Sequence, residues 1–258
     1  MSEFLLSELT EQGVLHLTFN RPDKKNAFNK AMWADFSQAL IDAQNDPRVA
    51  CVLLTGAGKD FSSGMDLNDF SGNDEGDEPH PFYAAQKTLC EFDKPLIGAA
   101  KGIAIGGGAT ILFHCDVIYV GESLKMRLPF TSLGLVPEFA ASYMLQAMIG
   151  SRRAAELFYT AEWINAERAI ETGIATARFS DEQLVRSALD KACEIAKWPV
   201  SSLQATKQCL KASHQAGLAS ALELEKAGMD KLAGGPENIE AVMAFIEKRD
   251  PDFSKFRQ

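Results

Sequence analysis

Alternating and continuous apolar runs dominate the first part of the chain. Residues 4–10 and 14–20 alternate apolar with polar side chains on either side of a Glu-Gln-Gly turn at 11–13. Period-two alternation around a short glycine turn predicts a β-hairpin. The continuous apolar runs at 50–55 and 96–100 are typical of buried strands. Two more short strands are expected at 116–121 and 125–128.

Helical spacing appears between and after these strands. Asn29 is expected to cap a helix that ends before Asp46-Pro47, and a second helix is expected over 82–91. The predicted buried face of the first helix carries Met32, Trp33, Phe36, Leu40 and Ile41. From Glu138 onward the pattern is almost entirely helical. Alternating strands and helices followed by helices indicate an α/β layer structure with a helical tail. A weak break at Trp198-Pro199 predicts a core over 1–198 and a C-terminal helical region over 199–258.

Three consecutive glycines follow the strand predicted at 96–100. A turn at Gly106, Gly107 and Gly108 would lead from that strand into a helix-compatible stretch at 109–114. Such a turn can direct unpaired backbone N–H groups at an anion, or at a carbonyl oxygen that becomes one. The stretch has neither a phosphate-loop ending nor the dinucleotide fingerprint. Alternatively, the glycines only let a helix pack closely on a sheet.

Composition narrows the class of function. The 258-residue chain carries a formal net charge of −9 and no long basic run, which disfavours nucleic acid as a partner. Five scattered cysteines without a C-x-x-C and four separated histidines predict free thiols in a reducing compartment and no metal site. There is no signal-peptide pattern and no apolar run of membrane-spanning length. We therefore expect a cytoplasmic protein that is not membrane-bound.

Four separated segments then carry a family resemblance. They are Asn20–Ala27, Phe61–Leu67, Lys94–Gly108 with the following Cys115-Asp116, and Phe245–Arg249. In this order and spacing they resemble the enoyl-CoA hydratase/isomerase (crotonase) superfamily. The resemblance implies an α/β fold, a spiral of ββα units with a C-terminal helical trimerisation region, and a homotrimer or a dimer of trimers. It also implies an acyl-CoA thioester as substrate, with coenzyme A as part of that substrate and no separate cofactor.

The same resemblance assigns roles to individual residues. The backbone N–H groups of Met65 and Gly107 would form an oxyanion hole for the thioester oxygen. Phe245 and Lys248 would reach coenzyme A from a neighbouring subunit, and Lys25 would help with phosphate, although each lysine is by itself an ordinary surface charge. The remaining residues implied in the coenzyme A path are Ser63, Gly64, Asp66, Leu67 and Gly106.

The sequence departs from the hydratases at both of their catalytic glutamates. Those positions hold Thr110 and Phe130 here, so both would be pocket residues that cannot activate water. One carboxylate remains, Glu138, in a Pro129–Glu138 string that is similar to that of 3-enoyl-CoA to 2-enoyl-CoA isomerases. The resemblance therefore implies an isomerase of the fatty-acid oxidation type with Glu138 as its single acid–base.

Other functions stay open at this point. They are enoyl-CoA hydration, dienoyl-CoA isomerisation and non-catalytic acyl-CoA binding. The acyl chain length cannot be derived from the sequence, although the segment 69–82 and residues after Glu138 are expected to set the pocket floor. The acidic run at 73–78 has no assigned role beyond that of a solvated loop.

Overall fold

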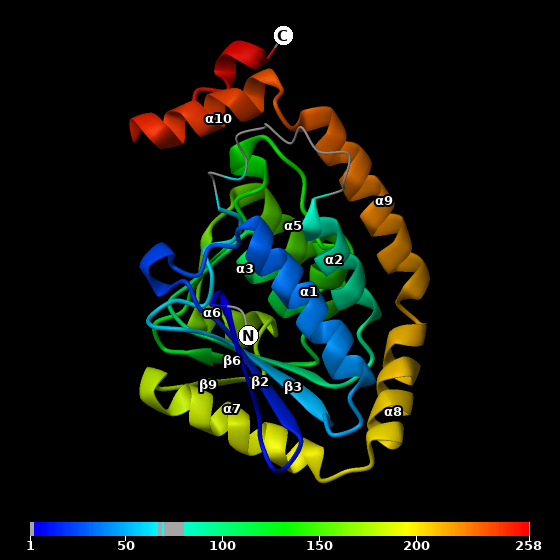
Figure 1. The fold of residues 1–258 in the computed structure, drawn as a ribbon. Helices are drawn as coiled ribbons and strands as arrows, with labels where there is room; N and C mark the ends of the chain where they lie inside the picture. Colours follow the sequence, from blue (N-terminus) through cyan, green and yellow to red (C-terminus); the bar gives the residue numbers. More distant parts are fainter. Residues whose placement is uncertain (1–2, 67–68, 70–79, 258) are drawn as a thin grey trace.

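The fold is built on a six-stranded sheet with helices on both faces (Figure 1). The computed structural model describes residues 3–66, 69 and 80–257. The first strand pairs antiparallel with the second, and the remaining neighbours are parallel. In sheet order the strands are β1 (Leu5–Leu9), β2 (Val14–Phe19), β3 (Cys51–Gly56), β4 (Leu96–Ala100), β6 (Val117–Gly121) and β9 (Ala177–Phe179).

A second, three-stranded sheet branches off after β4. Its strands are β5 (Ile103–Ile105), β7 (Lys125–Arg127) and β8 (Trp163–Asn165). Strand β5 is parallel to β7, and β7 is antiparallel to β8. An isolated bridge joins Ser62 to Ala104 of β5, so the loop after β3 runs beside this small sheet.

Strand periodicity divides the core between the two faces of the large sheet. In β3, Val52 and Leu54 belong to the main core, to which α1 (Lys30–Asn45) and α2 (Pro81–Glu91) contribute. The alternate residues Cys51 and Leu53 instead pack against α7 (Asp181–Ala196). Successive strand side chains point to opposite faces, so both faces of this sheet must be covered and its strands read as continuous apolar runs.

The connecting helices are short. They are the 3-10 turn η1 (Pro22–Lys24), α3 (Gly107–Thr110), η3 (Ile111–His114), η4 (Thr131–Leu133), α4 (Ala141–Ile149), α5 (Ser151–Thr160) and α6 (Ala166–Thr172). The helix-compatible stretch after the glycines is thus one α-helical turn followed by a 3-10 turn.

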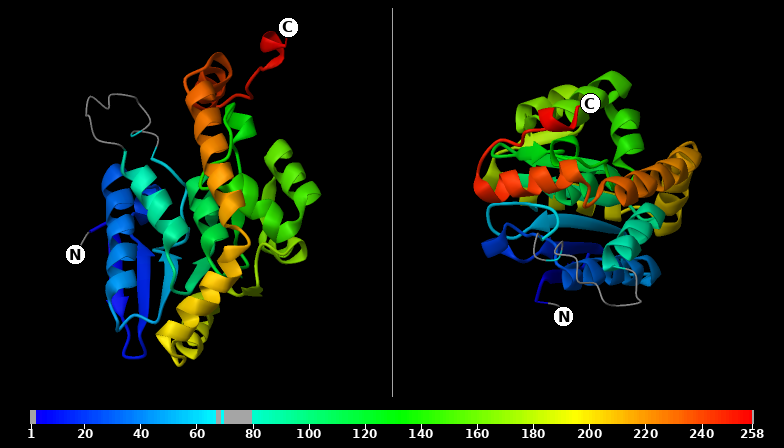
Figure 2. Two further views of the ribbon diagram at one scale, coloured as in Figure 1. Left: turned by 90° about the vertical axis from the view of Figure 1, so that its right-hand side faces the viewer. Right: turned by 90° about the horizontal axis from the view of Figure 1, so that it is seen from above.

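Helices make up most of the C-terminal part, with α8 (Val200–Ala212), α9 (Gln215–Leu232), α10 (Pro236–Glu247) and the 3-10 turn η5 (Ser254–Phe256). Figure 2 shows α9 running along the body between the α1–α2 pair and the α4–α5 pair, with α10 at its far end. Within the described ranges, no helix combines the length and the apolarity needed to cross a membrane.

Most sequence predictions of elements are confirmed, including the hairpin, whose strands β1 and β2 pair around the turn at 11–13. The Asn29 side chain accepts a hydrogen bond from Met32 N at 2.9 Å, so Asn29 caps α1 as expected. Ile41 was wrongly placed on the buried face, since it is 42% exposed. Strands β5, β8 and β9 were missed, whereas β7, which is as short, was expected; three residues show too little of a period to be a reliable signal.

Candidate active site

Two loops meet at their glycines to form one wall of the site. The Gly64 φ angle is +84°, and a Cβ there would lie 2.6 Å from the Ile105 carbonyl oxygen. A Cβ on Gly108 would lie 2.4 Å from the Ser62 carbonyl oxygen. Both distances are too short for a side chain, so glycine at 64 and 108 is what allows the loop after β3 to contact the glycine triplet. Close packing therefore explains part of the triplet.

The same contact brings together the two backbone donors expected from the sequence. A Cβ on Gly64 would lie 3.4 Å from the Gly107 nitrogen, so the peptide leading to Met65 is a neighbour of the first residue of α3. Within the described part of the chain, neither the Met65 N–H nor the Gly107 N–H donates a hydrogen bond. Two free donors on adjacent, rigid backbone segments can accept a carbonyl oxygen that gains negative charge.

Glu138 extends to this position from the turn before α4. A Cβ on Gly107 would lie only 3.0 Å from Glu138 Oε1 and 3.5 Å from Trp33 Cη2. The Glu138 carboxyl makes no hydrogen bond or ion pair with another described residue. Burial raises the pKa of this carboxyl to about 8, and the charge of Glu225 adds to the shift. The site thus holds an unpaired carboxyl that can take up or release a proton near neutral pH.

The backbone that carries Glu138 is strained. Phe139 and Ala140 both adopt positive φ angles, 59° and 53°. For non-glycine residues this costs about 1–3 kcal/mol each and persists only where the surroundings fix the conformation. The His114 ring helps to fix it, because Nε2 donates a 2.6 Å hydrogen bond to the Phe139 carbonyl oxygen. Burial lowers the pKa of His114 to about 4, so this ring is neutral at pH 7.

Aromatic rings pack against the turn that carries Glu138. The Phe139 ring lies 5.6 Å from the Trp33 ring and 5.0 Å from the Phe82 ring. Trp33 in turn stacks on Phe28 at 4.0 Å, and Phe28 forms a bridge with Met65. A connected apolar cluster therefore links the base, the donor loop and α1, which fixes their relative positions.

A cavity of about 330 Å³ lies in front of Glu138 and is large enough for a small ligand. Helices α2 and α9 form its two sides, and Met65 and Pro137 lie next to the base. The described residues of the lining are Met65, Asp69, His80, Phe82, Tyr83, Gln86, Pro137, Glu138, Leu222, Glu225, Lys226, Met229, Asp230 and Ala233.

Glu225 of α9 is a second carboxylate in this lining that the sequence analysis missed. It is buried and accepts hydrogen bonds from the backbone N–H groups of Ala140, at 2.7 Å, and Ser142, at 2.9 Å. Its position could have been suspected, because Leu218, Ala221, Leu222 and Glu225 follow helical spacing. A carboxylate on an apolar stripe needs a partner.

The remaining carboxylates of the cavity are engaged. Asp230 forms a 2.7 Å ion pair with Lys226, and Asp69 Oδ2 accepts a 2.7 Å hydrogen bond from the Lys30 backbone N–H. Glu138 thus differs from the other described acids of the lining in having no partner. The described residues contain no group of three His, Cys, Asp or Glu side chains arranged to hold a metal ion.

Two residues expected in the pocket do not line this cavity. Thr110 is fully buried, and its Oγ1 donates a 3.3 Å hydrogen bond to the Gly107 carbonyl oxygen. Phe130 is buried against Phe158, with ring centroids 6.3 Å apart. Neither side chain is in the cavity lining.

The expected coenzyme A residues fall into two groups. Ser63 N donates to the Lys25 carbonyl oxygen at 2.9 Å, and Asp66 forms a 2.9 Å ion pair with Arg21, so these residues cluster beside Gly64. Gly106 joins this region through its contact with β7, since its N–H donates to the Arg127 carbonyl oxygen. Leu67 lies outside the described residues, as does the acidic run at 73–78.

Phe245 and Lys248 form the second group and lie at the C-terminal end of α10. Both are exposed, and neither lines the cavity of its own chain. The opposite end of α10 is the one that packs on the body, where Asn238 Nδ2 donates a 2.8 Å hydrogen bond to the Leu133 carbonyl oxygen.

Comparison with known proteins shows the family to which the chain belongs. The sequence model of the family described as enoyl-CoA hydratase/isomerase matches residues 9–256. The chain belongs to the enoyl-CoA hydratase/isomerase family. It is 35% identical to the 1,2-epoxyphenylacetyl-CoA isomerase of Escherichia coli, a match that covers 98% of this chain and 99% of the relative. It is also 31% identical to enoyl-CoA delta isomerase 2 of Rattus norvegicus, over 93% of this chain and 63% of that protein.

Hydratases occur among the family relatives as well. The 2,3-dehydroadipyl-CoA hydratase of Escherichia coli is 32% identical, over 98% of this chain and 99% of the relative. The crystal structure of an enoyl-CoA hydratase/isomerase from Pseudoalteromonas atlantica superposes with a TM-score of 0.93 at 33% identity, covering 97% of this chain and 99% of that one. The fold is therefore the crotonase fold, and the chain is an enzyme of the hydratase/isomerase family that acts on acyl-CoA thioesters.

Proposed function

We propose that the chain is an acyl-CoA isomerase that moves the double bond of a 3-enoyl-CoA to the 2-position, as in fatty-acid oxidation. The observation that carries the proposal is the unpaired Glu138 carboxyl beside Gly107, whose pKa burial raises to about 8. Hydratase chemistry places water between two glutamates, and both of the positions expected for them hold other residues, Thr110 and Phe130. A single mobile proton is what an isomerisation requires.

The reaction begins at C2 of the acyl chain. Ionised Glu138 removes a C2 proton, which the thioester carbonyl and the alkene both acidify. The electron pair moves into a dienolate whose oxygen accepts hydrogen bonds from Met65 N–H and Gly107 N–H, and one such donor lowers the barrier by about 3 kcal/mol. The carboxylic acid of Glu138 then returns the proton to C4, which leaves the double bond conjugated with the thioester.

The environment of Glu138 suits both half-reactions. A raised pKa makes the carboxylate a stronger base and keeps the acid form available for the return step. Phe82, Phe139 and Trp33 lie around the turn, so the side of the cavity that carries Glu138 is apolar, which disfavours a water that would take the proton or add to the product. This balance explains how one group can serve as both base and acid.

We propose further that the protein assembles as a homotrimer, or a dimer of trimers, in which α10 lies against a neighbour. Supporting this, α10 exposes Ile239, Val242, Met243, Phe245 and Ile246. Exposed apolar surface of this extent on one helix is typical of an interface. Phe245 and Lys248 would then contact coenzyme A bound to a neighbouring subunit, and Ser63, Gly64, Asp66, Leu67, Gly106 and Lys25 would contact it in the subunit's own site.

One observation favours hydration as a second candidate. Glu225 lines the same cavity as Glu138, so the site contains a second glutamate after all. Both oxygens of Glu225 already accept backbone hydrogen bonds, which leaves it poorly placed to activate water. The isomerase proposal is therefore the better supported of the two.

Paired assays on the purified protein test the proposal. A 3-enoyl-CoA is followed for appearance of the conjugated 2-enoyl thioester, and crotonyl-CoA is followed for loss of its double bond. We expect conjugation without comparable hydration. Fast hydration would contradict the proposal and assign a catalytic role to Glu225. Binding of both thioesters without turnover would replace it with an acyl-CoA-binding function.

A further inference from the structure

We propose that Glu225, on α9, is a positioning residue that holds the strained turn carrying Glu138 and sets the protonation of Glu138 from across the cavity. This inference rests on the proposed function, because it concerns the group assigned there as acid–base. Through its carboxylate, Glu225 connects the C-terminal helical region to the residue that carries out the catalytic step.

Glu225 completes a helix that has no capping side chain of its own. The N-cap of α4 is Ala140, which lacks a side-chain acceptor for the first N–H groups of the helix. Glu225 Oε2 accepts from Ala140 N and Oε1 from Ser142 N, so the carboxylate replaces the missing cap from a distant helix. A negative charge at this end also favours the helix dipole.

The cap acts on the turn itself. Ala140 is the second of the two residues with positive φ, and the first is Phe139, next to Glu138. His114 binds the Phe139 carbonyl oxygen from one side, and Glu225 binds the Ala140 N–H from the other. Two anchors on consecutive residues fix a conformation that alanine and phenylalanine would not adopt unaided.

Helix α9 is firmly docked, so Glu225 can serve as a fixed point. Leu218 and Ala221 pack on Ala140, and the Tyr143 hydroxyl hydrogen-bonds His214 Nδ1 at 2.9 Å. A Cβ on Gly228 would lie 2.9 Å from the Val136 side chain, which places α9 directly on the turn. The carboxylate is therefore held by its own helix as well as by its two hydrogen bonds.

The second effect of Glu225 is electrostatic. In its charged form Glu225 disfavours ionisation of Glu138, in the direction of the raised pKa. Burial also raises the pKa of Glu225, while its hydrogen bonds from Ser142 and Ala140 favour the charged form. The opposite charges of Lys226 and Asp230 largely offset each other at Glu138, because the two side chains form an ion pair. The His114 ring, on the other side of the turn, is neutral at pH 7. The titratable groups that line the cavity around Glu138 are Asp69, His80, Tyr83, Glu225, Lys226 and Asp230.

Carbon-13 NMR of glutamate-labelled protein tests the electrostatic effect without requiring turnover. The Glu138 signal is assigned by its loss in Glu138→Gln and then titrated in Glu225→Gln. We expect its midpoint to fall by about one pH unit relative to wild type. Glu223→Gln is the matched control, since Glu223 is exposed on the same helix and its variant should titrate like wild type. An unchanged midpoint in Glu225→Gln would overturn the inference, whether or not the protein isomerises 3-enoyl-CoA.

Kinetics separate positioning from charge. Glu225→Asp keeps the charge but withdraws the carboxylate from the two N–H groups, so kcat should fall about tenfold while KM and the pH profile stay close to wild type. This variant also serves if Glu225→Gln does not fold. A wild-type kcat in Glu225→Asp would contradict the positioning role. If wild type itself shows no isomerase activity, the proposed function fails while the NMR titration still decides the electrostatic part.

Discussion

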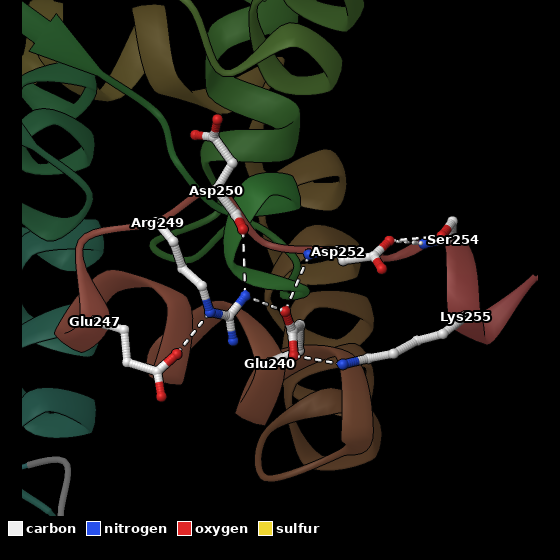
Figure 3. Close-up of polar contacts among 7 residues, drawn as sticks. All are labelled: Glu240, Glu247, Arg249, Asp250, Asp252, Ser254 and Lys255. Carbon is white, nitrogen blue, oxygen red and sulfur yellow. Dashed lines mark hydrogen bonds and ion pairs between the residues drawn. The ribbon is translucent and has the colours of Figure 1, made fainter.

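Two glutamates of this protein occupy opposite environments, the partly exposed Glu138 and the buried Glu240. Glu138 has no partner among the described residues, and burial raises its pKa to about 8. Glu240 of α10 accepts from Arg249 Nη1 and Lys255 Nζ, both at 2.6 Å, and from Asp252 N at 3.0 Å (Figure 3). The hydrogen bond from Arg249 is the largest cause that lowers the pKa of Glu240 to about 2.

The contrast separates a chemical group from a structural one. A fully paired carboxylate such as Glu240 is fixed in its charged form and can only hold the C-terminal residues 249–255 against α10. The protein instead leaves Glu138 unpaired at the point where two backbone N–H groups are also free. The two carboxyls therefore differ chiefly in their partners, and the one without a partner is the one that can react.

The largest predicted effect is the loss of activity when the unpaired glutamate is replaced. Replacing Glu138 with Gln should lower kcat for 3-enoyl-CoA isomerisation by about 10³-fold or more, because the amide cannot accept the C2 proton. Binding of the acyl-CoA, measured by calorimetry, should persist. The same change at Glu240 is the matched control and should leave kcat close to wild type. Retained turnover in Glu138→Gln would remove the residue from the mechanism.

A smaller loss is expected from Gly107→Ala. The new Cβ would lie 3.0 Å from Glu138 Oε1, so the carboxyl must move. Displacing a catalytic group by a fraction of an ångström should reduce kcat about 10- to 100-fold. The Gly107 φ angle is not positive, so the fold should tolerate alanine, as circular dichroism and thermal unfolding would show. Full activity would mean that catalysis does not depend on the position of Glu138 Oε1 beside Gly107.

The pH dependence of the rate tests the assignment of Glu138 as the catalytic base. Below a pKa of about 8, Glu138 is mostly protonated and cannot act as the base. Wild-type kcat/KM should therefore fall about tenfold per pH unit below that value and level off above it. Steady-state assays between pH 5.5 and about pH 9 would establish the profile. A profile that is flat through neutrality would indicate a carboxyl with an ordinary pKa.

The smallest effects concern stability, where the two glutamates should act in opposite directions. Between the ordinary value of 4.5 and about 8, folded Glu138 keeps a proton that the unfolded chain releases, so rising pH reduces stability. The Tm advantage of Glu138→Gln over wild type should therefore grow from pH 5 to pH 8.

For Glu240 the sign reverses. Its lowered pKa stabilises the fold above 4.5, and this contribution disappears as pH falls toward about 2. Glu240→Gln should have a lower Tm than wild type at pH 7, with the difference shrinking on acidification. Parallel pH curves for all three proteins would show that neither carboxyl has a shifted pKa.

Local signals in the sequence predicted much of the fold. The alternation at residues 4–20 and the Asn29 cap depend on neighbours along the chain, and both are present as expected. The three-residue strand β9 exists only because it pairs with β6, which lies far away in sequence. Ile41 follows the helical period but lies at the rim of the buried face, which the period does not reveal.

The candidate site was predictable as far as it follows motifs. Gly107, Met65 and Glu138 could be proposed from short sequence strings. Helical spacing shows only that Glu225 lies on an apolar face, and its contact with Ala140 could not be foreseen, since 85 residues separate the two. Neither that contact nor the positive φ angles of Phe139 and Ala140 leave a local pattern. Both arise from the docking of α9 on the turn, a property of the tertiary structure.

The most direct test of a single-carboxyl relay follows the proton itself. A 3-enoyl-CoA carrying deuterium at C2 is converted in ordinary water under single-turnover conditions, and the product is analysed by NMR and mass spectrometry. If Glu138 takes the label from C2 and returns it in a cavity that excludes water, a measurable share of product carries deuterium at C4. Product that never carries the label at C4 would contradict the account, because another group or solvent would then supply the second proton.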